Sequence, residues 1–371
     1  MSSVGLATFP GDDYYSQTVT RALHIIDRDT PADMLMQLSA LVGEDDAIVS
    51  AGPAGRFDLL GRAQFVHQPL GSAVLCGFKL AGLIDAEVVH AWSARAQRVG
   101  QVVARINGRI LVRSVPAVPP SGKPLRRLLR SLSHPELLIT VPSQAGRKRL
   151  IEAEIDCRRI AVVPPPAPRI DNLEDRRRQM RAELGIEADE LVLIAPDELV
   201  RPANQQLSAW AHAIIQYALD ERSRLILPLG GRMERTVMHF ARGTGFMETI
   251  FGPFGLNRFL DAVSAADAAI FFRRSDCGLT GVVAAMSAGL PIAAFDTPDV
   301  LECAGEAAIK ASARTPRAAA QALLELIENP DLQEKLRRSA KRRAAEFTIQ
   351  SSQDKLREVY QTATAGSVAA A

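Results

Sequence analysis

Histidine side chains are the first candidates for chemistry in this 371-residue chain, because an imidazole can exchange a proton near neutral pH or bind a metal. His90 lies near the end of the apolar run 88–91. If that run is a strand of a parallel sheet, His90 is close to the edge where such sheets bind ligands. A histidine within an apolar strand is more often an ordinary core residue, so both interpretations stay open.

The common catalytic and metal-binding patterns are absent from the sequence. There is no GxxxxGKS/T phosphate loop, no HExxH and no GxSxG. The glycine pair at 243 and 245 precedes a predicted strand instead of following one, so it is not a dinucleotide-binding turn. The four cysteines are scattered and form no CxxC pair, which predicts no metal site and indicates buried thiols in a reducing cytosol.

Short β-branched runs alternate with helical patterns along most of the chain, and these elements must position any site. The predicted strands are 23–26, 47–50, 64–66, 88–91, 110–112, 137–141, 191–195, 224–229, 249–252, 268–272 and 291–295. The predicted helices include 32–42, 94–106, 316–328, 331–347 and 351–360. Thr30 is the expected N-cap of the first helix. Apolar strands separated by helices predict two doubly wound, Rossmann-like parallel-sheet domains that face each other across a cleft.

A proline-rich segment divides the chain into two parts. Residues 163–168 read VPPPAP, which cannot form a central strand, and a charged stretch follows. We therefore expect the interdomain linker at about 164–172. The expected organisation is a flexible lead-in (1–20), an N-terminal acceptor domain (21–165), a C-terminal donor domain (166–345), and a C-terminal helix with a frayed tail (346–371).

Charge and hydropathy exclude several classes of function. The chain has 44 Lys and Arg against 42 Asp and Glu, so it lacks the basic excess of a non-specific nucleic-acid binder. It has no apolar run of the ~20 residues that span a bilayer and no signal-peptide pattern, which predicts a cytoplasmic protein. The basic run 125–130, LRRLLR, is either a solvated helix face or a weak contact with the anionic inner face of a membrane.

Three segments of the second half resemble a known family. They are Val162-Val163-Pro164-Pro165, then Leu229-Gly230-Gly231 between a strand and a helix, and then residues 275–292, SDCGLTGVVAAMSAGLPI. Together they resemble nucleotide-sugar glycosyltransferases of the GT-B fold, most closely family 4. The resemblance covers about residues 20–361 and is stronger from 140 onward.

The resemblance implies a transferase of carbohydrate biosynthesis. The donor would be a UDP- or GDP-sugar, acting as co-substrate without a further cofactor, and the acceptor a glycan or a lipid-linked molecule. Transfer would retain the anomeric configuration and need no metal. Family members neutralise the diphosphate with an Arg, a Lys and helix N-termini. They place two carboxylates in an E-x7-E pattern, one beside the sugar and one on the ribose hydroxyls.

The same resemblance assigns roles to particular residues. Asp276 takes the place of the first carboxylate, beside the sugar, and His90 would lie on the acceptor side of the cleft. The expected donor-binding residues are Arg201, Asn204, Gly230, Gly231, Phe251, Gly278, Leu279, Thr280 and Glu302. Among them, Arg201 would balance the phosphate charge with Asn204 as a neutral donor, and the glycine turns would present backbone N–H groups.

The sequence departs from the family pattern at charged positions. Ala284 stands where the second carboxylate is expected and cannot hold a ribose hydroxyl. The expected cations are missing, and Asp197 and Glu198 stand where they would repel phosphates. These departures favour a second hypothesis, a catalytically degenerate GT-B scaffold that acts through a binding partner. The glycine turns favour the first hypothesis, an active glycosyltransferase.

Each marker also has a purely structural interpretation. The pair Gly230-Gly231 is equally consistent with a tight turn between a strand and a helix. Asp276 and Gly278 fit an ordinary turn, and Arg201 fits an exposed loop residue. The sequence leaves these alternatives open.

Overall fold

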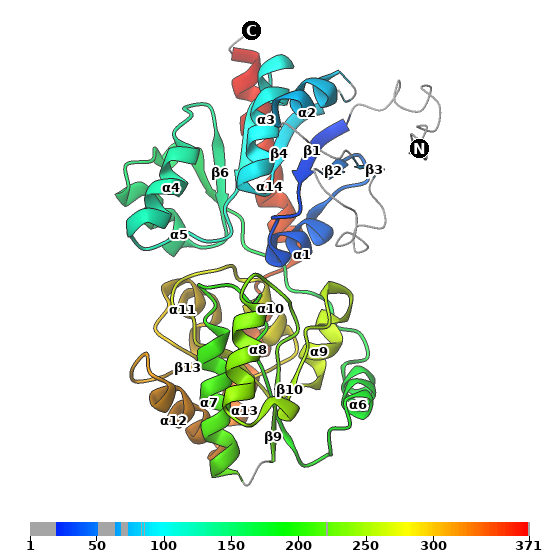
Figure 1. Ribbon diagram of the computed structural model, residues 1–371. Helices are drawn as coiled ribbons and strands as arrows, with labels where there is room; N and C mark the ends of the chain where they lie inside the picture. Colours follow the sequence, from blue (N-terminus) through cyan, green and yellow to red (C-terminus); the bar gives the residue numbers. More distant parts are fainter. Residues whose placement is uncertain are drawn as a thin grey trace, which may run out of the picture.

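The computed structural model describes residues 20–50, 64–67, 73–82, 84, 86–219 and 222–369. These residues form two α/β domains, one above the other in Figure 1. The chain passes from the first to the second through 163–170, which contain neither helix nor strand. The predicted lead-in over 1–20 lies, apart from Thr20, outside the described residues.

The first domain contains one parallel sheet. Its strands are β1 (Thr20–Ile26), β2 (Ala47–Ser50), β3 (Gln64–His67), β4 (Ala86–Ala91), β5 (Leu111–Ser114), β6 (Leu138–Val141) and β7 (Ile160–Val162). They pair in the order β3-β2-β1-β4-β5-β6-β7. The edge strand β7 is not among the predicted strands, because its three residues run directly into the proline-rich segment.

The second domain contains a second parallel sheet. Its strands are β8 (Leu191–Ile194), β9 (Ser223–Ile226), β10 (Ile250–Phe251), β11 (Ala268–Phe271), β12 (Ile292–Ala294) and β13 (Ala308–Lys310). They pair in the order β10-β9-β8-β11-β12-β13, which repeats the order of the first six strands of the other sheet. This is the doubly wound arrangement, so the predicted fold of two Rossmann-like domains is confirmed.

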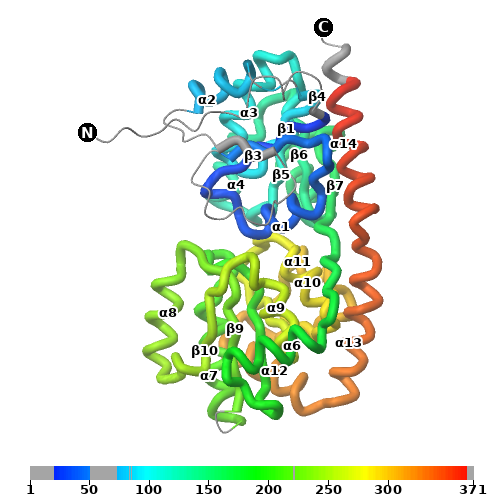
Figure 2. The backbone as a smooth tube through the Cα atoms, turned by 90° about the vertical axis from the view of Figure 1, so that its right-hand side faces the viewer, coloured from blue at the N-terminus to red at the C-terminus, as the bar shows by residue number. Residues whose placement is uncertain are grey.

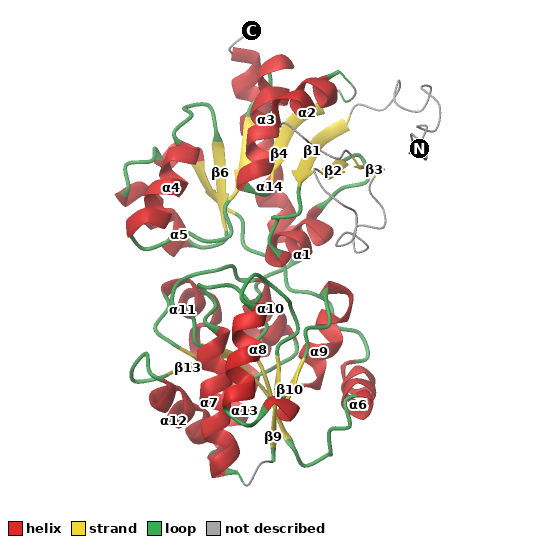
Figure 3. Ribbon diagram, viewed as in Figure 1, coloured by secondary structure: helices red, strands yellow, loops and turns green. Residues whose placement is uncertain are grey.

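Helices cover both faces of each sheet (Figure 3). Those of the first domain are α1 (Ala32–Leu41), α2 (Ala73–Ala81), α3 (Ala94–Ile106), α4 (Gly122–Leu132) and α5 (Gln144–Glu152). Those that follow are α6 (Leu173–Glu183), α7 (Gln205–Ala218), α8 (Glu234–Gly243), α9 (Phe259–Ala265), α10 (Thr280–Ser287), α11 (Pro298–Ala304), α12 (Pro316–Glu328), α13 (Pro330–Ala344) and α14 (Ile349–Ala369). Among the described helices, none is long and apolar enough to cross a membrane.

The strand β8 shows why the apolar runs in the sequence predict buried parallel strands. Val192 and Ile194 point into the hydrophobic cluster on one face of the sheet. Leu193 and Ala195 point into the cluster on the other face. Alternate residues of a strand face opposite sides, so a strand covered on both faces must be apolar throughout.

The last helix, α14, leaves the second domain and packs against the first. Figure 2 shows it running along the first domain, in line with α13 on the second. Its residues Leu356 and Val359 join Val88 of β4 and Val112 of β5 in one buried cluster. The helix continues to Ala369, beyond the predicted end at 360, and the last two residues of the expected frayed tail lie outside the described residues.

Two local expectations need correction. The N-cap of α1 is Pro31 and not Thr30, whose hydroxyl instead accepts a hydrogen bond from the Asp27 backbone N–H at 2.8 Å. The cysteines are also not all buried, since Cys157 is exposed. It is the first residue of a short 3-10 helix (Cys157–Arg159) between α5 and β7.

Candidate functional site

Asp276 lies where the carboxyl edge of the second sheet meets the first domain. It follows β11 and is almost fully buried. Arg149, on α5 of the first domain, forms an ion pair with the Asp276 carboxylate. The backbone N–H of Asp299, at the start of α11, donates to the same carboxylate at 3.3 Å. The residue expected beside the sugar is thus a buried carboxylate at the domain interface, and its cation comes from the other domain.

Asp299 completes a small charged cluster with Asp276 and Arg149. Its carboxylate lies 3.9 Å from the Arg149 guanidinium and accepts a hydrogen bond from the Ser143 hydroxyl at 2.7 Å. Burial and the neighbouring Asp276 raise the pKa of Asp299 to about 6. One arginine therefore faces two carboxyl groups, which leaves the cluster ready to hold a proton near neutral pH.

Asp197, which the sequence suggested would repel a phosphate, is neutralised within its own domain. Arg273 is fully buried after β11 and binds the Asp197 carboxylate through two nitrogens, at 2.5 and 2.6 Å. The same guanidinium donates to the Gly278 carbonyl at 2.7 Å. Arg273 therefore joins the loop after β8 to the turn before α10. Sequence reasoning missed it, because nothing local marks an arginine after a strand as the partner of a distant aspartate.

The N-terminus of α10 is occupied by a carboxylate from the first domain. The backbone N–H of Thr280 donates to Oδ1 of Asp33, on α1, at 2.7 Å. The Thr280 hydroxyl donates to the Asp33 carbonyl at 3.3 Å. Burial raises the pKa of Asp33 to about 6, which its hydrogen bonds with Thr280 and the charge of Arg273 limit. Asp33 has no signal in the sequence beyond lying in the first turn of a helix.

Gly278 is required at this contact for two reasons. Its φ is +112°, a conformation that L side chains rarely adopt. A Cβ at this position would also lie 2.5 Å from the Asp33 side chain. The glycine expected to let a ligand approach the backbone therefore admits Asp33.

Little space remains beside Asp33. A cavity of about 20 Å³ is bounded by Asp33, Asp197, Glu198 and Cys277, together with apolar residues. A cavity of that size holds about one water molecule. Among the described residues, and in this arrangement of the domains, the space beside Asp33 is too small for the diphosphate of a nucleotide-sugar.

The second position of the E-x7-E pattern lies in the core. Ala284, on α10, is fully buried in the main hydrophobic cluster of the second domain. A carboxylate there would be buried without a partner, which is costly. Leu279, expected to contact the donor, also packs its side chain into this cluster, so only its backbone could meet a ligand.

The expected donor residues before α7 have different surroundings. Arg201 is exposed in the loop that precedes the helix. Asn204 is buried, and its amide donates to the Phe272 carbonyl at 3.0 Å and accepts from Arg274 at 2.9 Å. Its side chain therefore ties the start of α7 to the end of β11 and is not free to bind a phosphate.

The glycine turn after β9 packs against the loop after β8. A Cβ on Gly231 would lie 2.5 Å from the Leu199 carbonyl oxygen. The Leu199 N–H in turn donates to the Gly230 carbonyl at 3.2 Å. Backbone packing therefore explains Gly231, whereas a Cβ on Gly230 would meet the Glu234 carboxylate at 3.0 Å. Phe251, at the end of β10, is partly buried against the core of the domain.

Glu302 does lie at the domain interface, but it contacts protein. Its two carboxylate oxygens accept hydrogen bonds from the backbone N–H groups of Gln144 and Ala145, both at 2.7 Å. These residues form the first turn of α5 in the first domain. Glu302 is exposed, unlike Asp276.

His90 lies in the core of the first domain and not at the cleft. Its ring nitrogens contact the Tyr360 hydroxyl at 2.8 Å and the Ser114 hydroxyl at 2.9 Å. The ring stacks on Trp92 at 4.4 Å between centroids and is fully buried. Burial, with His24 nearby, holds the pKa of His90 well below its usual range, so the ring is neutral. The expectation that His90 meets an acceptor is therefore corrected.

Comparison with solved structures identifies the fold. The chain resembles Anabaena HepE in complex with UDP-glucose at 16% identity and a TM-score of 0.75, covering 92% of this chain and 99% of that one. It resembles sucrose-phosphate synthase from Thermosynechococcus elongatus at 12% identity and a TM-score of 0.71, covering 93% of this chain and 100% of that one. It resembles a glycosyltransferase from Rickettsia africae at 12% identity and a TM-score of 0.69, covering 93% of this chain and 98% of that one. The fold is GT-B. No protein-family model matches the sequence, and no curated protein matches it.

The basic run 125–130 lies on α4 at the surface of the GT-B first domain. Leu125, Leu128 and Leu129 pack against the core of that domain. Arg126 and Arg127 are exposed. The leucines are therefore not available to enter a bilayer, and only an electrostatic contact with anionic lipids stays a prediction.

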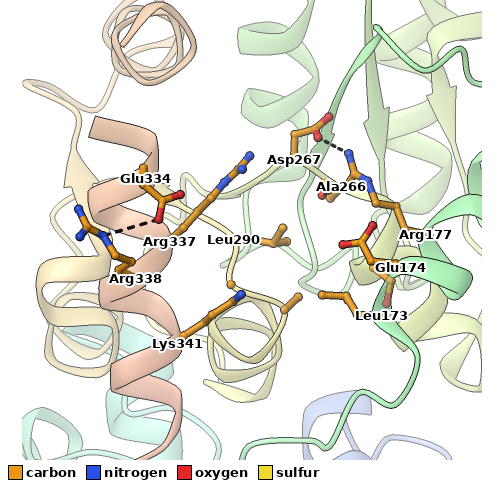
Figure 4. A pocket seen from close by; sticks show the side chains of 13 residues that line it. Leu173, Glu174, Arg177, Ala266, Asp267, Leu290, Glu334, Arg337, Arg338 and Lys341 are labelled. Carbon is orange, nitrogen blue, oxygen red and sulfur yellow. Dashed lines mark hydrogen bonds and ion pairs between the residues drawn. The ribbon is translucent and has the colours of Figure 1, made fainter. Parts of the chain in front are cut away.

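A separate pocket lies at the amino-terminal edge of the second sheet, where the loops before β11 and β12 meet α6 and α13 (Figure 4). Figure 4 shows that charged residues of its lining pair with each other, Arg177 with Asp267 and Arg338 with Glu334. Asp276 follows β11 at the opposite edge. The pocket is therefore separate from the domain interface.

Proposed function

We propose that the protein transfers a sugar from a nucleotide-sugar donor, binding the donor at the interface-facing edge of its second domain. The observation that carries this proposal is the placement of buried Asp276 immediately before the N-terminus of α10. A carboxylate beside the sugar and a helix N-terminus facing the phosphates are two groups that this reaction needs. The likeness to HepE in complex with UDP-glucose supports the choice of donor class.

The proposed roles of the residues follow from their chemistry. The backbone N–H groups at Thr280 would bind a phosphate oxygen. Arg149 would supply positive charge from the first domain, because it already reaches Asp276, and Arg201 would do so from the loop before α7. The acceptor, a glycan or a lipid-linked molecule, would bind to the first domain. Retention of configuration and independence of metal belong to this proposal through the family 4 resemblance.

Isothermal titration with UDP, GDP and ADP, with and without magnesium, tests the proposal. We expect one nucleotide to bind without metal. Asp276→Asn should then lower the rate of donor-sugar release by about tenfold or more, equivalent to about 1.4 kcal/mol. Asp296→Asn is the matched control, because Asp296 is exposed and pairs only with the surface Lys310. Thermal unfolding of both variants shows whether they are folded.

A second candidate function is a scaffold that binds a partner and turns nothing over. The fully buried Ala284 favours it, because the ribose-binding carboxylate has no replacement there. The scaffold would be supported, and the transferase contradicted, if none of the three nucleotides binds the folded protein at millimolar concentration. The same result is required of the Asp33→Ala variant, which lacks the contact that holds the domains closed at α10.

A further inference from the structure

The two domains each place a carboxylate on a helix N-terminus of the other. Asp33 of the first domain accepts the Thr280 N–H at the start of α10, at 2.7 Å. Glu302 of the second domain accepts two N–H groups at the start of α5, both at 2.7 Å. A helix N-terminus carries partial positive charge and unpaired N–H groups, so a carboxylate is a favourable partner there. Both contacts join the first domain to the second and therefore favour the closed arrangement.

Asp33 occupies the position that a phosphate would take. A carboxylate and a phosphate offer the same kind of anionic oxygen to a helix N-terminus. The Thr280 N–H cannot serve both, and the cavity beside Asp33 holds about one water molecule. Asp33 lies in α1 of the first domain, so a separation of the domains removes it from α10.

We propose that Asp33 is an internal latch, whose carboxylate stands in for a donor phosphate at α10 and excludes anionic ligands from that site until the domains separate. The identity of the excluded ligand as a nucleotide rests on the proposed function, whereas the latch itself does not. Arg232 of the second domain and Asp29 of the first domain also pair across the interface, at 2.6 Å.

The surroundings of Asp33 explain why the latch is confined to this point. The charged groups that face it are Glu198 and the pair Arg273 and Asp197, whose charges offset each other, and the Cys277 thiol lies beside them. Asp33 therefore has no cation of its own and depends on the helix N-terminus. Glycine is the only residue type at 278 that leaves room for the Asp33 carboxylate, because any Cβ there would lie 2.5 Å from it.

Hydrogen exchange of the full-length protein tests whether the latch exists in solution. Asp33→Ala should speed exchange of the peptide that contains Thr280 by about tenfold, because its amide loses its acceptor. Asp33→Asn removes the charge but keeps an oxygen that can accept this N–H, so it should speed exchange by a smaller factor. Asp45→Ala is the matched control, since the exposed Asp45 lies in the same domain away from α10. Unchanged exchange at Thr280 in both Asp33 variants, with folding verified by thermal unfolding, would overturn the latch.

Titration with UDP separates the latch from the proposed function. If both are correct, Asp33→Ala binds UDP about tenfold more tightly than the unmodified chain, because no conformational cost precedes binding. If exchange at Thr280 rises but no nucleotide binds, the latch stands and the donor site fails. If UDP binds the variant and the unmodified chain equally well, the site stands and exclusion by Asp33 fails.

Discussion

The helices α10 and α5 begin at the same interface and use different means to satisfy their first turns. The α5 helix carries its own cap, since the Ser143 hydroxyl accepts the Gly146 N–H at 2.9 Å. Its contact with Glu302 is an addition at an exposed position. The α10 helix begins after Leu279, which provides no side-chain cap, and relies on Asp33 of the other domain.

This difference indicates which of the two helix N-termini is available to bind a ligand. Backbone N–H groups at a helix start need a partner, from a cap, water or a ligand. The α5 helix has a cap residue in its own domain, so it keeps the Ser143 cap on the Gly146 N–H when the domains open. The α10 helix is then left with a free, positively polarised end beside Asp276, which is what an anionic donor requires.

The largest expected effect comes from breaking the support of the α10 side. Arg273→Met should lower the free energy of unfolding by about 3–5 kcal/mol, because it leaves the buried Asp197 carboxylate without its partner. Chemical denaturation measures this value. Arg232→Met, at an exposed pair, is the control and should cost less than about 1 kcal/mol. Equal losses of unfolding free energy in Arg273→Met and Arg232→Met would show that the buried pair contributes no more than the exposed one.

A smaller effect is expected from Gly278→Ala. The positive φ and the contact with Asp33 should together cost about 1–3 kcal/mol and free the Thr280 amide for exchange. Gly243→Ala, at the end of α8, is a suitable control, because no atom lies within 4 Å of the added Cβ. A Gly278 variant as stable as that control would show that Asp33 does not approach in solution.

The closed arrangement should also depend on pH through Asp33. Its pKa is about 6 when docked, against an ordinary value of 3.8, so closing the domains takes up a proton. This proton-linked part of the stabilisation is complete below pH 3.8 and is lost as the pH rises through about 6, whereas the hydrogen bond from Thr280 stays available to the ionised carboxylate. After allowance for solvent screening, we expect the closed arrangement to lose about 1 kcal/mol of stability between pH 5 and pH 7.5. X-ray scattering would show this loss as an increase in the radius of gyration.

Asp33→Asn should remove this dependence. Asp299 titrates in the same range, because burial and the neighbouring Asp276 raise its pKa to about 6. A pH response that persists unchanged in Asp33→Asn would therefore assign it to the cluster around Asp276 and not to α10.

The smallest effect is expected on the α5 side. Glu302→Gln should destabilise the closed form by less than about 1 kcal/mol, because the position is exposed and Ser143 still caps the helix. Hydrogen exchange at Gln144 and Ala145 reports it directly. A loss as large as that for Asp33→Ala would mean that the two helix ends are equivalent.

The sequence predicted much of the scaffold, because the signals for it are local. The all-apolar strand at 191–194 and the helix at 316–328 follow from patterns within a few residues. It also placed Asp276 and the Gly278 turn before α10. It misplaced His90, because the face of β4 that carries His90 is covered by α14, more than 250 positions later. No local pattern announces such a return.

The sequence by itself determined two Rossmann-like domains, their order, and the position of Asp276 and a glycine turn ahead of a helix. Hydrophobic periodicity and turn chemistry fix these features over short distances. The tertiary structure alone decided that Arg273 neutralises Asp197, that Arg149 reaches Asp276, and that Asp33 fills the α10 N-terminus. Each of these contacts joins residues far apart in the chain, and such a contact exists only after both elements have packed.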